Sequence, residues 1–355
     1  MSDLNPLAPS APSRGIEAFR RLALSLSLSS LFIALFSLLA STDESVSLAA
    51  FFLSPFRSRT MFPAILEAAA PLAICALGAL MAFRAGHFTL GGEGQVYAGA
   101  FAGAAAGIVA PAGSLGLAAA MTAGVLGGML VAAPSAAGRR FTGADVLLTS
   151  FLVSQAAIFG IDWAIGGPLR DPVNNLVAMR AIPGASLLQR IAPPSTLTLA
   201  PLVALVLVLL AWAFLSGTRS GARLTLYGKN RMFARLQGFP VDTLSWLPIV
   251  IAGGAHGLAG AMLSLGANGT AVRGISGGLG WSAIGVALIA GNEPVAVPFA
   301  ALLFAWLDAG ARQASILSDL PPDAAMVIKA LVILTATARP ALRGVRRLAG
   351  ENSGR

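Results

Sequence analysis

Charged residues are scarce in this 355-residue chain. Asp, Glu, Lys and Arg together make up 11% of it, against about 25% in ordinary soluble domains. Hydrophobic residues make up 56%, and a soluble protein of this size needs far more polar surface than remains. The composition therefore argues against a soluble enzyme and predicts an all-α, polytopic membrane protein.

Reactive side chains are also few. The single cysteine, Cys75, stands in an apolar run and cannot form an internal disulfide, and His87 and His256 are too far apart for a local metal pair. The one Gly-Lys pair, Gly228-Lys229, is followed by asparagine rather than Ser or Thr, so it does not make a phosphate-binding P-loop. No Ser-His-Asp set or HExxH motif is visible. We expect no metal, no bound cofactor and no catalysis by this chain.

Apolar runs of membrane-spanning length recur along the sequence. Ten spans are predicted, at 22–40, 64–83, 90–110, 115–133, 145–165, 197–215, 246–267, 274–290, 295–309 and 324–338. The eighth and ninth are short and flanked by Gly or Pro, so we expect them to be broken or partly re-entrant. The 40 glycines suit close packing between helices in lipid. The predicted fold is a helical bundle of about ten (8–10) transmembrane helices.

The basic residues give this bundle an orientation. With both ends cytoplasmic, 16 of the 24 Lys and Arg residues fall in cytoplasmic regions and six in outside loops, as the positive-inside rule requires. Residues 1–21 form a proline-containing cytoplasmic tail that we expect to be disordered, residues 22–338 the transmembrane domain, and residues 339–355 a basic cytoplasmic tail. The bias explains the net charge of +9 without nucleic acid.

The cytoplasmic loop at 217–245 is amphipathic in patches. Its apolar residues alternate with basic ones; they are Leu224, Leu226, Met232, Phe233 and Leu236, with Arg223, Lys229, Arg231 and Arg235. One interpretation is a helix lying on the anionic inner leaflet. The other is a short helix that docks into a partner protein. Composition alone leaves both open.

Charged residues in or beside the spans are costly, by about 2.5–3.5 kcal/mol on insertion scales, and normally face the bundle interior or water. They are Glu67, Glu93, Asp145, Asp162, Asp308, Arg312 and Lys329. Asp145, Asp162 and Arg312 stand near predicted span ends, which suits interfacial caps. The acids are too scattered to favour an ion relay. Glu93 is distinctive because glycines surround it and Gln95 follows closely.

Four segments together resemble one family. "FTLGGEGQ", followed by Gly99-Ala100, is similar to the signature F-N-I-G-x-E-G-Q-x-x-x-G-A, with Thr89 in place of asparagine. "TGADVLLTSFLVSQ" and "GPLRDP" resemble a helix and loop of the same family, with Asp145 where glutamate is usual. "AGGAHGLAGA" resembles its S-G-x-L-A-G-L-A-G-A helix.

The fourth segment lies in the basic loop and matches G-x-N-x-x-A-A-x-x-x-G at Gly228, Asn230, Ala234 and Gly238, with Phe233 at the first alanine. Taken in their order along the chain, the four segments resemble the permease subunits of bacterial ABC importers for simple sugars and nucleosides. The resemblance covers about 64–338.

The resemblance implies an inner-membrane permease that works with separate ABC ATPase subunits, which carry ATP and Mg²⁺. It also implies a substrate-binding lipoprotein or periplasmic protein and a second permease subunit, and we expect a heterodimer rather than a homodimer. ATPase coupling is assigned to Gly228, Lys229, Asn230, Arg231, Ala234, Arg235 and Gly238. Gly228 and Gly238 are expected to allow tight turns, Ala234 to allow close approach to the ATPase, and the basic residues to complement an acidic groove.

The substrate pathway or a helix break is assigned to Gly92, Glu93, Gly94, Gln95, Gln155 and Asn268. Glu93 either braces a break by capping backbone amides or contacts the substrate. The alternative functions are an ion-coupled secondary transporter or channel that needs no ATPase, and a membrane scaffold.

Overall fold

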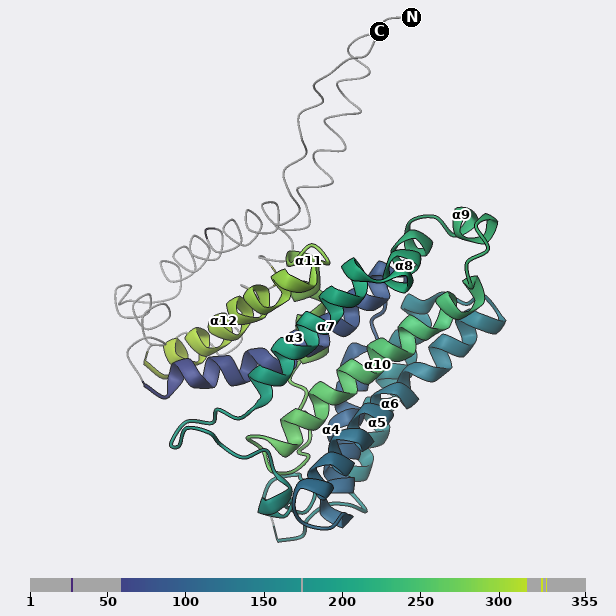
Figure 1. Cartoon of the computed structure of the whole chain (residues 1–355). Helices are drawn as coiled ribbons and strands as arrows, with labels where there is room; N and C mark the ends of the chain where they lie inside the picture. Colours follow the sequence, from purple (N-terminus) through teal and green to yellow (C-terminus); the bar gives the residue numbers. More distant parts are fainter. Residues whose placement is uncertain (1–26, 28–58, 174, 318–326, 328–329, 331–355) are drawn as a thin grey trace, which may run out of the picture.

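The computed structural model describes residues 27, 59–173, 175–317, 327 and 330 (Figure 1). Apart from the single residues 27, 327 and 330, the predicted spans 22–40 and 324–338 lie outside the described residues. The predicted tails at 1–21 and 339–355 lie outside them as well. The described regular structure is helical, as predicted, with one isolated β-bridge between Ala178 and Val272.

The described part of the chain contains ten α-helices and two short 3₁₀ turns. They are α3 (Met61–Arg84), α4 (Gly92–Val109), α5 (Ser114–Phe141), α6 (Val146–Gly166), η1 (Gly184–Ser186), α7 (Ala200–Gly217), α8 (Arg219–Lys229), α9 (Arg231–Leu236), α10 (Val241–Leu265), α11 (Leu279–Ile289), η2 (Pro294–Ala296) and α12 (Val297–Leu317).

Six of these segments are long and apolar enough to cross a membrane: α3, α5, α6, α7, α10 and the stretch Pro294–Gln313. Helix α11 has only 11 residues, about 17 Å at 1.5 Å per residue, or half of a bilayer core. The expected short eighth span is therefore confirmed.

The expectation of a short ninth span at 295–309 is wrong, because α12 continues without a break to Leu317. The polar residues Asp308 and Arg312 interrupt the hydropathy of the sequence. They are accommodated without ending the helix because both line a cavity that opens to the surface, where Arg312 is exposed.

Two faces of the bundle can be told apart. One end carries α8 and α9 (Figure 1), together with the ends of α3 and α5 and the start of α10. We call it the basic face, because α3 ends with Arg84 and the last turn of α5 contains Arg139 and Arg140. The opposite end carries the connections 167–199 and 266–278, and we call it the loop face. Helix α11 starts in the interior and ends at the basic face.

Glycines let α4, α5 and α10 pack with their backbones in contact. A Cβ atom on Gly128 of α5 would lie 2.1 Å from the Gly253 carbonyl oxygen of α10. A Cβ atom on Gly260 of α10 would lie 1.9 Å from the Val96 carbonyl oxygen of α4. No side chain larger than hydrogen fits at either position, so the small-residue composition is a direct requirement of this three-helix centre.

The two connections of the loop face pair with each other. Met179 N–H donates to the Ala271 carbonyl at 3.0 Å, Ile182 N–H to the Gly269 carbonyl at 2.9 Å, and Arg273 N–H to the Val177 carbonyl at 2.9 Å. The long connection after α6 thus holds the segment that leads from α10 into the start of α11.

We expect Gly128→Ala to destabilise the protein by about 1–3 kcal/mol, because the new methyl group overpacks the contact with α10. Gly160→Ala on α6 is the matched control, since nothing lies within 4 Å of the added Cβ. Thermal unfolding in detergent, followed by size-exclusion chromatography, measures both. Equal stability of the two variants would contradict this account of the centre.

Candidate functional site

Glu93 lies where two helices begin in the protein interior. It is in the first turn of α4, and only 7% of its surface is exposed. Its Oε1 accepts a hydrogen bond from Gly278 N–H at 2.9 Å, and its Oε2 accepts one from Gly280 N–H at 2.8 Å. Both amides belong to the start of α11, where N–H groups lack partners within the helix and the helix dipole favours a negative charge.

The starts of α4 and α11 touch because glycine occupies both. A Cβ atom on Gly280 would lie 2.2 Å from Glu93 N and 2.4 Å from the Gly92 carbonyl carbon. Gly278 has φ +78°, a conformation that other residues rarely adopt. The glycines around Glu93 in the sequence therefore serve a close contact between two helix starts that are far apart in the chain.

We call the contact between the starts of α4 and α11 the junction at Glu93. Helix α6 packs against the other side of this junction. Ser154 Oγ accepts a hydrogen bond from Gly94 N–H at 2.8 Å, and Ser150 Oγ accepts one from Leu90 N–H at 3.0 Å. Gln95 is 1% exposed, and its Oε1 has no hydrogen-bond partner among the described residues. These two serines were not singled out by sequence reasoning, because serine in an apolar helix carries little signal by itself.

The six residues predicted for the pathway or helix break do not all lie in one place. Gly92, Glu93, Gly94 and Gln95 lie at the junction, and Gln155 is half-buried on the adjacent α6. Asn268 instead follows the end of α10, where its Nδ2 donates to the Leu263 carbonyl at 2.8 Å. Their roles in transport stay predictions. A substrate contact by Glu93 would have to displace two hydrogen bonds to α11.

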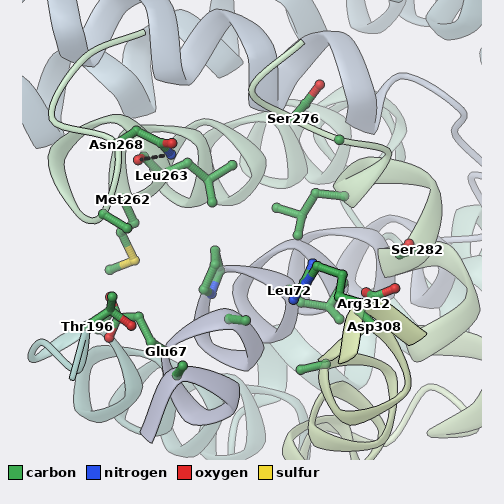
Figure 2. A pocket seen from close by; sticks show the side chains of 18 residues that line it. Glu67, Leu72, Thr196, Met262, Leu263, Asn268, Ser276, Ser282, Asp308 and Arg312 are labelled. Atoms are coloured by element: carbon green, nitrogen blue, oxygen red, sulfur yellow. Dashed lines mark hydrogen bonds between the residues drawn. The ribbon is translucent and has the colours of Figure 1, made fainter. Parts of the chain in front are cut away.

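Asn268 lines a cavity of about 490 Å³ between α3, α7, α10, α11 and α12 (Figure 2). Its walls carry the apolar side chains Leu72, Met262, Leu263 and Leu279. Three charged side chains also reach it: Glu67, Asp308 and Arg312. The sequence showed each as an isolated charge in an apolar run, but it could not show that α3 and α12 bring them together.

One charged group of the cavity, the Glu67 carboxylate, is held by hydrogen bonds. Glu67 accepts hydrogen bonds from Thr198 N–H at 2.8 Å and from Thr198 Oγ at 2.8 Å and 3.0 Å, immediately before α7 begins. Asp308 and Arg312 are one helical turn apart on α12, and both line the cavity. The predicted interfacial cap at Arg312 is therefore better described as a residue of the cavity wall.

On the basic face, α9 is a short helix with an apolar outer surface. Asn230 begins it, with its Oδ1 accepting from Phe233 N–H at 2.9 Å. Met232, Phe233 and Leu236 are 65%, 43% and 78% exposed. Arg231 and Arg235 are exposed beside them. This surface combines the apolar and basic residues whose alternation the sequence displayed.

Ala234 does not belong to that outer surface. It is fully buried and packs in a cluster with Ala85, Leu224 and Tyr227. The expectation that Ala234 allows close approach to an ATPase is therefore corrected: its small size allows α9 to approach the permease itself. Helical spacing places Ala234 opposite the exposed side chains, and only the packing shows which side faces inward.

Of the two glycines expected to make turns at the ends of the coupling segment, Gly238 does so, with φ +69°. Gly228 instead lies in α8, where an added Cβ would come within 2.1 Å of the Arg84 carbonyl oxygen. Its function is close contact with the turn between α3 and α4, so the expectation of a turn at Gly228 is wrong.

His87 also joins the turn between α3 and α4 to α9 and to the first turn of α10. Its Nε2 lies 3.4 Å from the Leu244 carbonyl oxygen and its Nδ1 lies 3.4 Å from Arg231 Nη2. Burial, with a smaller effect from the charge of Arg139, lowers the pKa of His87 to about 4. The imidazole is therefore neutral near pH 7, which allows it to donate to the carbonyl and accept from the guanidinium.

The same turn holds the far end of α11. Arg84 Nε donates to the Asn292 carbonyl at 2.9 Å, and Arg84 Nη2 pairs with Glu293 Oε1 at 3.0 Å. Both partners follow directly after α11. Residues 84–93, which include the connection between α3 and α4, therefore link α8 and α9 on the basic face with both ends of α11.

Comparison with known proteins identifies the family. Residues 61–337 match the model described as "Branched-chain amino acid transport system / permease component". The chain belongs to this family of membrane permeases. The match includes every described helix, so the junction at Glu93 and the coupling segment lie within the family's common region.

The curated relatives are named for different solutes. The chain is 34% identical to the "Probable riboflavin import permease protein RfuC" of Treponema pallidum, over 87% of this chain and 84% of that protein. It is 30% identical to the guanosine ABC transporter permease protein NupP of Bacillus subtilis, over 78% and 80%. It is 27% identical to the glucose ABC transporter permease protein TsgB13 of Haloferax volcanii, over 76% and 74%.

We expect Glu93→Gln to reduce solute uptake and Glu93→Ala to reduce it further. A glutamine offers one acceptor and one donor group, so it satisfies one of the two amides of α11 and opposes the other, whereas alanine satisfies neither. Uptake in cells and thermal stability of the purified subunit measure the two effects. Full uptake and stability of Glu93→Ala would show that α11 needs no carboxylate.

Proposed function

We propose that this chain is the inner-membrane permease subunit of an ATP-binding cassette importer for a nucleoside, a simple sugar or a related uncharged solute. The observation that carries the proposal is the outer surface of α9, where exposed Met232, Phe233 and Leu236 stand beside exposed arginines on the basic face. An apolar centre with a basic rim is suited to docking in a groove of a partner protein. The names of the curated relatives support this class of transporter.

The basic face is assigned to the cytoplasm, because an excess of Lys and Arg marks cytoplasmic segments. Separate ATPase subunits dock there and bind ATP and Mg²⁺, and this chain binds no cofactor. A substrate-binding protein delivers the solute at the loop face, and a second permease, forming a heterodimer, completes the membrane unit. The named relatives that are described as ABC transporter permeases support this assembly.

The contacts of α8 and α9 provide a physical route for coupling. A movement of α9 would be transmitted through Gly228 and His87 to the turn at 84–91, since these contacts leave no space between the elements. From there Arg84 connects to the end of α11 and Glu93 to its start. Closure of an ATPase dimer is thereby coupled to the position of α11 inside the membrane.

We expect Leu236→Asp to lower co-purification of the cognate ATPase by about tenfold or more, as loss of a central apolar contact does in many interfaces. Leu236→Met is the matched control, because it keeps the surface apolar, and it should co-purify normally. ATP-driven uptake in proteoliposomes completes the test. If Leu236→Asp bound the ATPase normally, or if the purified chain alone transported solute on an ion gradient, the alternative of a secondary transporter would replace this proposal.

Ala234→Asp should behave differently from Leu236→Asp. It places a carboxylate among the buried Ala85, Leu224 and Tyr227, so we expect loss of the folded subunit itself, by about 3 kcal/mol or more. Expression level and the melting temperature of the isolated subunit measure this. A stable Ala234→Asp subunit that only fails to bind the ATPase would contradict the inward orientation of Ala234.

A further inference from the structure

We propose that the cavity between α3, α7, α10, α11 and α12 is a solute-binding chamber of this subunit. We further propose that it accepts an uncharged solute with a flat apolar face and a hydroxyl-bearing edge, as nucleosides and flavins have. The inference rests on the proposed function and adds to it a place and a chemical class. Neither the family description nor the relatives' names assign such a chamber.

The position of the cavity suits a solute arriving at the loop face. Thr196 and Asn268 lie in the connections of that face and border the cavity, and Arg312 comes from the last turns of α12. Leu279 and Ser282, from the first turns of α11, also border it, and that helix starts at the junction with Glu93. The chamber is therefore lined by the half-length helix whose two ends are held by Glu93 and Arg84.

The size and walls of the cavity narrow the chemical class. Its volume of about 490 Å³ lies within the range of about 300–1,000 Å³ usual for small-molecule sites. Leu72, Met262 and Leu279 supply an apolar wall, while Asn268, Ser276 and Ser282 supply hydrogen-bonding groups. A free hexose would have to place hydroxyl groups against the apolar wall at a cost in desolvation. A heterocycle that carries a polyol uses both kinds of wall.

The charges of the cavity disfavour anions. Its lining has two carboxylates, Glu67 and Asp308, and one guanidinium, Arg312. Glu67 is engaged by Thr198. Among the described lining residues the carboxylates outnumber the guanidinium, so a phosphorylated solute would meet a net negative charge and lose hydration on entry. Nucleosides are therefore expected to enter, and nucleotides are not.

Cysteine labelling of the complete transporter tests the chamber. Cys75 is fully buried and is the only cysteine, so Cys75→Ala provides a background for Ser276→Cys. With the cognate ATPase and binding protein present, a membrane-impermeant thiol reagent added outside should label Ser276→Cys. Guanosine or riboflavin should slow the labelling by about tenfold near saturation, whereas glucose and guanosine 5′-monophosphate should leave it unchanged.

Asn268→Cys serves as the second site if Ser276→Cys does not fold. Gly184→Cys, in the exposed connection of the loop face with nothing within 4 Å of an added Cβ, is the control that no solute should protect. Absence of protection by guanosine and riboflavin, or equal protection by the nucleotide or glucose, would overturn the chamber or its chemical class. ATP-dependent uptake is measured in the same vesicles. Uptake without protection removes this inference alone, whereas uptake that needs no ATPase removes the proposed function.

Filling the cavity with a larger side chain gives a second test. Its result cannot be explained by the binding protein shielding the labelled cysteine. Leu72→Trp fills the cavity and should lower ATP-driven uptake of guanosine by about tenfold or more, since a filled pocket excludes its ligand. Leu202→Trp on the exposed side of α7 is the matched control. The ATPase should co-purify equally with both variants. Unchanged uptake by Leu72→Trp would show that the solute does not pass through this cavity.

Discussion

The pair of hydrogen bonds from the start of α11 to the carboxylate of Glu93 is the interaction on which the interior of this protein depends. A helix that begins inside the membrane leaves its first N–H groups without water to bind, and each unsatisfied group is costly there. Glu93 accepts from two of them, at 2.9 Å and 2.8 Å. The cost of burying the carboxylate is in turn offset by these bonds and by the dipole of α11.

This constraint explains several neighbouring choices of residue. Gly280 and Gly92 bring the two helix starts into backbone contact, and Ser154 of α6 accepts from the next amide of α4. The result is a half-length helix with one end at a polar junction and the other at Arg84. The cavity lies against α11, and the coupling segment lies against the turn that holds it, so one element connects both regions.

The coupling segment shows how packing decides what a pattern means. The alternation of apolar and basic residues from Leu224 to Leu236 predicted an amphipathic element, and α8 and α9 are such an element. The alternation could not show that Ala234 turns inward while Met232 and Leu236 remain exposed. The outward apolar residues Met232, Phe233 and Leu236, rather than Ala234, therefore form the surface proposed for the ATPase.

The sequence by itself determined the membrane class, most of the spans, the short eighth segment and the location of the amphipathic loop at 217–245. Each of these depends on composition or on residues that are close in the chain. Only the tertiary structure decided the partner of Glu93, which is 185 positions away, the continuity of α12 past Asp308, and the cavity that gathers Glu67 and Arg312. These features depend on which helices pack together, because the free energy of a buried charge is set by neighbours that local sequence does not specify.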